Sequence, residues 1–137
     1  MAFVAVIIIS CNNSKKETKG YPLQGAWELT YTKYVYPDTT YETTQFANPD
    51  VKLLTKRHFA FGLQSGADKI VGGGGEYTYD GNIYTEFVKY HTWFSFFVGK
   101  SIEFKSTLKG DLWTISGIFK NDTLQINATE TWKRIPE

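Results

Sequence analysis

The chain has 137 residues, a length that one domain accounts for. Its 15 basic and 14 acidic side chains nearly cancel, and they form no basic stripe, so nucleic acid is not an expected partner. The single cysteine excludes an intrachain disulfide, and the fold must therefore be held by packing alone. Aromatic residues make up 17% of the chain, and this enrichment favours strands.

The N-terminus is an apolar run over residues 1–10, followed directly by the only cysteine, Cys11, and then by a polar stretch. The run is too short to cross a bilayer as a helix, which needs about 20 residues. The junction Ile8-Ile9-Ser10-Cys11 resembles the lipobox of bacterial lipoproteins, a family in which the cysteine is acylated and the bond before it is cut.

This resemblance implies a signal peptide over residues 1–10 and a lipidated tether over residues 11–22. The mature protein would then be anchored to the lipid bilayer through acylated Cys11, because two or more acyl chains hold a protein stably to a membrane. The expected location is the cell envelope of a Gram-negative bacterium, on the periplasmic face or the cell surface. The alternative is a short buried strand with a free core cysteine.

Apolar and polar residues alternate with a period of two over most of the remaining chain, and this pattern predicts strands. The expected strands are residues 27–32, 51–62, 76–79, 82–91, 102–107, 112–118 and 123–135. In the first of them Trp27, Leu29 and Tyr31 share one face. Residues 38–50 are expected to form a polar connection that ends in a turn, and residues 64–75 a loop that ends in four glycines.

No stretch keeps a helical period, so little helix is expected. Sequential strands joined by tight turns, among them the type I′ signal Asp80-Gly81, predict an all-β fold, a small up-and-down antiparallel β-barrel or a sandwich. Closure of a barrel removes the exposed edges that a single β domain must otherwise protect, and we expect a monomer. A barrel of about eight strands holds either side chains or one small ligand.

Three segments resemble the lipocalin-like domains of the calycin group over a domain spanning residues 23–137. Gly25-Ala26-Trp27 matches the Gly-x-Trp signature of the first strand, residues 130–134 resemble a closing strand, and residues 72–86 resemble the glycine-rich middle pattern. The resemblance implies that Trp27 packs at the closed end of the barrel and that Arg134 lies across its indole. Both residues would then be structural.

Glu86 is an acidic residue on a face that it shares with Tyr84, Val88 and Tyr90, and Lys89 occupies the other face. If Lys89 faces water, Glu86 faces the interior, where a carboxylate needs a partner or must protonate. The possible partners are His58 and Arg134. Three roles remain open for Glu86: ligand contact, internal ion pairing, or an outward position in a reversed register with Thr85 and Phe87 inside. The candidate ligand-binding residues are aromatic or polar, and they are His58, Tyr77, Tyr79, Tyr84, Glu86, Tyr90 and Phe104.

No pattern indicates catalysis, a metal or a cofactor. The two histidines lack a metal-ligand spacing, no Gly-x-Ser-x-Gly nucleophile motif is present, and residues 72–75 lack the lysine of a phosphate loop. The aromatic run over residues 93–97 is either a packed inter-strand segment or an exposed lid. Because these catalytic motifs are missing, we expect that the protein is not an enzyme.

The leading hypothesis is a membrane-anchored, lipocalin-like lipoprotein that binds a small apolar or amphipathic molecule. The alternative is a filled barrel that acts as a protein-interaction or inhibitor module in the envelope.

Overall fold

The computed structural model describes residues 20–137, so the expectations for Cys11 and the signal peptide lie outside the described residues. Within that part of the chain, the regular elements are nine strands and one short 3-10 helix. In chain order they are β1 (Gly25–Val35), β2 (Thr40–Thr43), β3 (Val51–Leu54), β4 (His58–Gln64), β5 (Ile70–Tyr79), β6 (Ile83–His91), η1 (Ser95–Phe97), β7 (Ser101–Lys109), β8 (Leu112–Lys120) and β9 (Gln125–Arg134).

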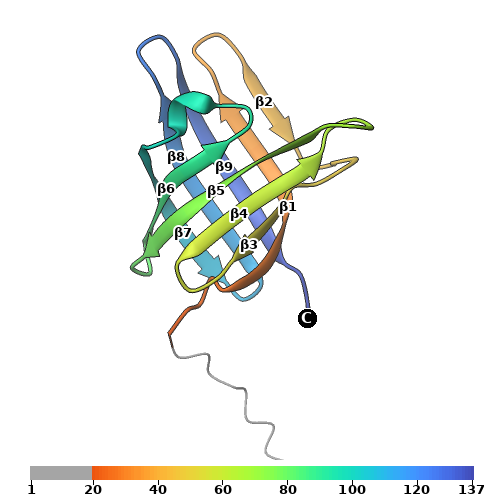
Figure 1. Cartoon of the computed structure of the whole chain (residues 1–137), viewed down its shortest axis with the longest axis vertical. Helices are drawn as coiled ribbons and strands as arrows, with labels where there is room; N and C mark the ends of the chain where they lie inside the picture. The colour runs from red at the N-terminus through yellow and green to blue at the C-terminus, as the bar shows by residue number, and fades with distance from the viewer. Residues whose placement is uncertain (1–19) are drawn as a thin grey trace, which may run out of the picture.

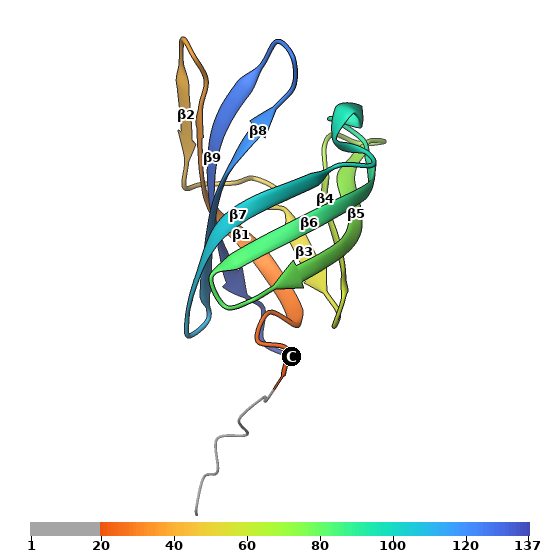
Figure 2. The same ribbon diagram turned by 90° about the vertical axis from the view of Figure 1, so that its left-hand side faces the viewer.

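The strands form a closed barrel (Figure 1). Strands β3 to β9 pair in sequence order, and β1 pairs with both β3 and β9, so that eight antiparallel strands close the ring. Strand β2 is an addition that pairs with the end of β1, from Thr32 opposite Thr43 to Val35 opposite Thr40. The prediction of a small up-and-down antiparallel barrel is confirmed. Figure 2 shows β1, β2, β8 and β9 splayed away from β4, β5 and β6 at the end that carries η1. We call this the open end.

Two predicted segments are wrong in their boundaries. The expected single strand over residues 51–62 is two strands, because the polar residues Lys56 and Arg57 form the tip of a hairpin between β3 and β4. At this turn the Thr55 hydroxyl accepts a hydrogen bond from the His58 amide at 3.0 Å. The expected connection over residues 38–50 contains β2.

The glycine run over residues 72–75 is not a loop but the middle of β5, and the prediction of a flexible connection is wrong. The neighbouring strands occupy the space that side chains would need at these positions. A Cβ at Gly73 would lie 2.8 Å from Cε1 of Phe61, a ring on β4 that covers this part of β5. Glycine is required here because of close packing.

Two β-bulges change which residues face the interior. In β1 the register against β9 shifts between Leu29 and Tyr31, and Tyr31 faces outward, where its hydroxyl donates to Glu42 at 2.9 Å. In β6 the partners of Gly74 and Gly75 are Tyr90 and Val88, which leaves Lys89 as the extra residue. A bulge inverts the alternation beyond it, so two predictions are wrong: Tyr31 does not share the face of Trp27 and Leu29, and Tyr90 does not share the face of Glu86.

The closed end of the barrel, opposite the open end, is filled by large side chains. Trp27 and Trp113 are both fully buried, with ring centroids 5.4 Å apart. The guanidinium carbon of Arg134 lies 4.1 Å from the centroid of Trp27, and its two terminal nitrogens donate to the carbonyls of Gln24 and Pro22 at 2.8 and 2.7 Å. The segment that precedes β1 is thereby attached to the closed end. Figures 1 and 2 show residues 20–24 entering the barrel at this end.

Candidate functional site: a cavity at the open end

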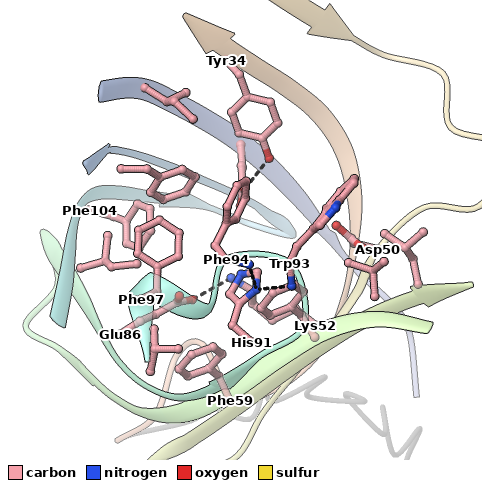
Figure 3. Close-up of a pocket in the computed structure, with 18 of the residues that line it drawn as sticks. Tyr34, Asp50, Lys52, Phe59, Glu86, His91, Trp93, Phe94, Phe97 and Phe104 are labelled. Atoms are coloured by element: carbon pink, nitrogen blue, oxygen red, sulfur yellow. Dashed lines mark hydrogen bonds and ion pairs between the residues drawn. The ribbon is translucent and has the colours of Figure 1, made fainter. Parts of the chain in front are cut away.

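A cavity of about 420 Å³ lies inside the barrel and reaches toward the open end. Its wall is mainly aromatic and aliphatic (Figure 3). The aromatic side chains that line it are Tyr34, Tyr36, Tyr41, Phe59, Phe61, Trp93, Phe94, Phe97, Phe104, Phe119 and Trp132. A concave, mostly apolar space with a few polar groups is the usual form of a small-molecule site.

Lys52 of β3 and Glu86 of β6 meet at the inner wall of this cavity. The ammonium nitrogen and Glu86 Oε1 are 2.8 Å apart, and the two side chains are 5% and 8% exposed. Lys52 Nζ also lies 4.7 Å from the ring centroid of Trp132 and between 5.6 and 5.7 Å from four further rings. The carboxylate and the π faces together stabilise the buried cation.

Tyr84 lies behind the cavity wall and forms a hydrogen bond with the Glu86 side of this ion pair. It is fully buried, and its hydroxyl donates to Glu86 Oε1 at 2.9 Å. Burial, with the added effect of the Glu86 charge, raises the pKa of Tyr84 well above its ordinary value, so the hydroxyl remains a donor. Glu86 Oε1 thus accepts hydrogen bonds from both Lys52 and Tyr84, and the charge of Glu86 is compensated within the protein.

Glu130 of β9 is held by neutral donors only. The Tyr34 hydroxyl donates to Oε1 at 2.8 Å, and the Trp132 indole donates to Oε2 at 3.1 Å. Burial raises the pKa of Tyr34 far above its ordinary range, and the charge of Glu130 adds to the rise. These hydrogen bonds orient the carboxylate without cancelling its charge.

Asp50, directly before β3, is the third carboxylate of the cavity wall. Its Oδ1 atom is buried without a hydrogen-bond partner among the described residues. Burial, with the added effect of the Glu130 charge, raises the pKa of this carboxyl to about 6, although the Lys52 charge opposes both. An unpaired buried oxygen of this kind is costly for the empty protein.

His91 enters the cavity wall because of the bulge in β6. Its Nδ1 accepts the amide hydrogens of Trp93 and Phe94, both at 3.1 Å. Burial lowers the pKa of His91, although the Glu86 charge opposes this, so the imidazole is neutral at pH 7. Since Nδ1 accepts, the proton of the neutral ring is on Nε2.

The aromatic run over residues 93–97 lies beside the mouth of the cavity, and it is partly packed between strands and partly exposed. Phe97, on η1, is 4% exposed and packs against Phe119 with centroids 5.2 Å apart. Trp93 is 65% exposed and still lines the cavity. The run therefore closes part of the wall and leaves one indole at the rim.

The structure brings together only some of the candidate ligand-binding residues. Glu86 and Phe104 line the cavity, and Tyr84 lies beneath it. The other candidates are elsewhere. Tyr77 donates to the Thr55 carbonyl at 2.7 Å and Tyr79 to the Gly81 carbonyl at 3.0 Å. Neither of them lines the cavity.

His58 and Tyr90 are exposed on the outer surface, so neither can contact a ligand inside the barrel. The suggested partners of Glu86 are also wrong. His58 is at the tip of the β3–β4 hairpin and Arg134 is stacked on Trp27, whereas Lys52 holds Glu86. The reversed register is excluded because Phe87 is 38% exposed and Glu86 is buried.

The candidate residues from the sequence do not include seven polar residues of the wall: Tyr34, Tyr36, Tyr41, Asp50, Lys52, His91 and Glu130. For Glu130 a signal exists, because it alternates with the inward-facing Ala128 and Trp132. For Lys52 the local pattern is misleading, since Leu53 beside it is 54% exposed while the lysine is 4% exposed.

Within residues 20–137 no group of three or more His, Cys, Asp or Glu side chains is placed to hold a metal ion. In the same range no helix has the length and apolar character needed to cross a membrane.

Comparisons with known proteins identify the family of the chain and a solved structure with a similar fold. The model of a family described as "Domain of unknown function (DUF4488)" matches residues 22–137. Among solved structures, an uncharacterized protein from Bacteroides eggerthii superimposes with a TM-score of 0.53 at 12% identity, over 82% of this chain and 98% of that one. A redesigned beta barrel is similar over 83% of this chain and 92% of its own, with a TM-score of 0.47 and 15% identity. No curated protein matches the chain.

Proposed function

Because the chain belongs to the DUF4488 family, whose function is unknown, we propose a function from the site itself. The protein is a binding module of the Gram-negative cell envelope, anchored to a membrane through acylated Cys11. Its lipocalin-like barrel holds one small apolar or amphipathic molecule in the cavity.

The observation that carries this proposal is the cavity of about 420 Å³. Protein interiors are packed nearly as densely as organic crystals, and few voids exceed the size of a water molecule. A space within the range of roughly 300–1,000 Å³ that is usual for ligand pockets therefore favours binding over the alternative of a filled barrel that acts only through its surface.

The attachment of Pro22 and Gln24 to the closed end is consistent with anchoring through Cys11. The segment before β1 is fixed to the closed end by Arg134, and the cavity reaches toward the opposite end. A barrel anchored through residue Cys11 would therefore present its open end to the aqueous side. A ligand would enter past Trp93 and the β1–β2 connection without passing the lipid surface.

A titration with Nile red, a neutral apolar dye, tests ligand binding. Ile126 points into the cavity and is 2% exposed, whereas Ile118, on the outer surface of the adjacent strand, is 51% exposed. Ile126→Trp should fill part of the cavity and abolish most of the dye's fluorescence gain. Ile118→Trp, which adds the same indole outside, should leave it unchanged.

Thermal melts of both variants establish that they are folded, since overpacking a core costs typically about 1–3 kcal/mol. Equal dye binding by folded Ile126→Trp and Ile118→Trp would mean that the dye binds elsewhere, and the proposal would then be wrong.

A further inference from the structure

The charges that line the cavity do not balance. Three carboxylates face it, from Asp50, Glu86 and Glu130, and one ammonium, from Lys52. His91 is neutral at pH 7, because burial lowers its pKa and its Nδ1 is occupied as an acceptor. The wall therefore carries an excess of two negative charges when all three carboxylates are ionised.

Among residues 20–137, the one ammonium group on the cavity wall is already paired. Lys52 Nζ is 2.8 Å from Glu86 Oε1, and the two charges of this pair cancel. Glu130 receives hydrogen bonds only from the neutral groups of Tyr34 and Trp132, and Asp50 Oδ1 receives none among the described residues. The uncompensated charge is thus that of Asp50 and Glu130, which both line the cavity and lie close enough for the Glu130 charge to raise the pKa of Asp50.

Resting on the proposed ligand binding, we infer that the cavity selects an organic ammonium ion with an apolar tail, whose cationic head lies against Asp50 and Glu130. The tail would occupy the space lined by Val88, Phe104 and Ile126. The head would supply the hydrogen-bond donor that Asp50 Oδ1 lacks.

The cavity that holds these carboxylates also has aromatic walls that suit a cation. Tyr36 and Tyr41 pack edge to face with centroids 5.5 Å apart, and both line the cavity, as does the exposed indole of Trp93. Figure 3 shows Asp50 on a different side of the cavity from Glu86. Aromatic faces attract ammonium groups, and the surroundings of Lys52 already show this arrangement inside the same barrel.

The same charges disfavour anions. A carboxylate ligand such as a fatty acid would place a further negative charge near Asp50 and Glu130 in a partly dehydrated space, where repulsion is stronger than in water. The empty protein also keeps a partly buried carboxyl with a raised pKa at this place, which costs stability. Such a costly group on the wall of a cavity is typical of a functional position.

Three probes with the same tail and different heads test the inference: decylammonium, decanol and decanoate. We expect calorimetry at about pH 7.5 to show decylammonium binding at least about tenfold more tightly than decanol, with decanoate weakest. Asp50→Asn should weaken decylammonium about tenfold and leave decanol within about twofold, and Glu130→Gln should act in the same direction. Asp122→Asn, on the exposed β8–β9 connection, is the matched control and should change nothing.

Two results would overturn the inference in distinguishable ways. If decanol or decanoate binds as tightly as decylammonium, or if both Asp50→Asn and Glu130→Gln leave the preference intact, the cationic selectivity is wrong while ligand binding stands. If none of the three probes binds the folded wild-type protein and Nile red also fails, the proposed function falls together with the inference.

Discussion

Lys52 and Glu86 form an ion pair across the barrel interior, with 2.8 Å between Nζ and Oε1 and with both side chains almost completely buried. The two residues come from strands that are not adjacent, β3 and β6, so the pair joins two parts of the wall. The same pair contacts two further residues, because the Tyr84 hydroxyl donates to Glu86 and the Trp132 ring lies 4.7 Å from Lys52 Nζ.

We expect Glu86→Gln to destabilise the protein by about 3–5 kcal/mol, because Lys52 would be left as an uncompensated buried charge. Urea melts measure this. Glu76→Gln is the matched control, since Glu76 and Lys89 form an exposed pair at 3.8 Å. Its cost should not exceed about 1 kcal/mol. The double variant Lys52→Met/Glu86→Gln should be more stable than the sum of the single effects by about 1–3 kcal/mol. Additive effects would show that the pair is not coupled.

Trp27→Ala should destabilise the fold by about 3–5 kcal/mol, because it removes a fully buried indole from the closed end. This is a large part of the roughly 5–15 kcal/mol that stabilises a typical domain. Arg134→Ala should cost less, and the two effects should be non-additive, since the guanidinium lies 4.1 Å from the indole centroid. Trp93→Ala, at an exposed position, should change stability by about 0.5 kcal/mol or less. Strict additivity of Trp27→Ala and Arg134→Ala in urea melts would argue against the stacking.

Asp50 should make stability depend on pH in the direction opposite to most acidic residues. Burial raises the pKa of Asp50 to about 6 from an ordinary value of 3.8. The folded state thus binds the Asp50 proton more tightly than the unfolded state does. The contribution of Asp50 to the free energy of unfolding therefore falls as the pH rises from about 4 to about 6, and it stays low at higher pH.

Asp50→Asn should therefore be more stable than the wild type at about pH 8, by about 1–2 kcal/mol. The figure is reduced from the full shift because the carboxyl is partly open to solvent. The advantage should vanish near pH 3.5, at about which the carboxyl is protonated in both states. Thermal melts across this range measure the difference. A wild type that is more stable than Asp50→Asn at pH 8 would show that Asp50 is paired in the folded protein.

Lipid anchoring is tested at Cys11. Radiolabelled palmitate should be incorporated into the wild type and not into Cys11→Ser, which should be found soluble or unprocessed, because the acylated sulfur and amino group are lost together. Equal labelling of the two proteins would rule out acylation at Cys11. The test is independent of the cavity, so its failure would remove the anchor and leave ligand binding unaffected.

The sequence predicts the barrel better than it predicts the site, for physical reasons. Alternation reveals strands wherever one face is buried, and it identified the inward position of Glu86. It cannot reveal the bulges near Thr30 and Lys89, because a bulge is a property of two paired strands. As a result Tyr90 was expected inside, whereas His91 is the residue that lines the cavity.

The remaining differences come from tertiary contacts that override local preference. Gly73 reads as a loop residue, yet it pairs with Phe61 and His91 in the sheet, and the Phe61 ring leaves no space for a side chain there. Lys52 reads as a surface residue, yet Glu86, distant in the sequence, compensates its charge inside the barrel. No pattern near Lys52 contains that information.

The central claim is that a small molecule binds inside the barrel, and methyl NMR during a decanol titration tests it most directly. Val88 and Ile126 line the cavity, whereas Val98 and Ile118 are 45% and 51% exposed on the outside. If decanol enters the cavity, the methyl signals of Val88 and Ile126 shift with one saturable curve and those of Val98 and Ile118 stay in place. Shifts confined to Val98 and Ile118, or no saturable shift at any of the four, would contradict the claim.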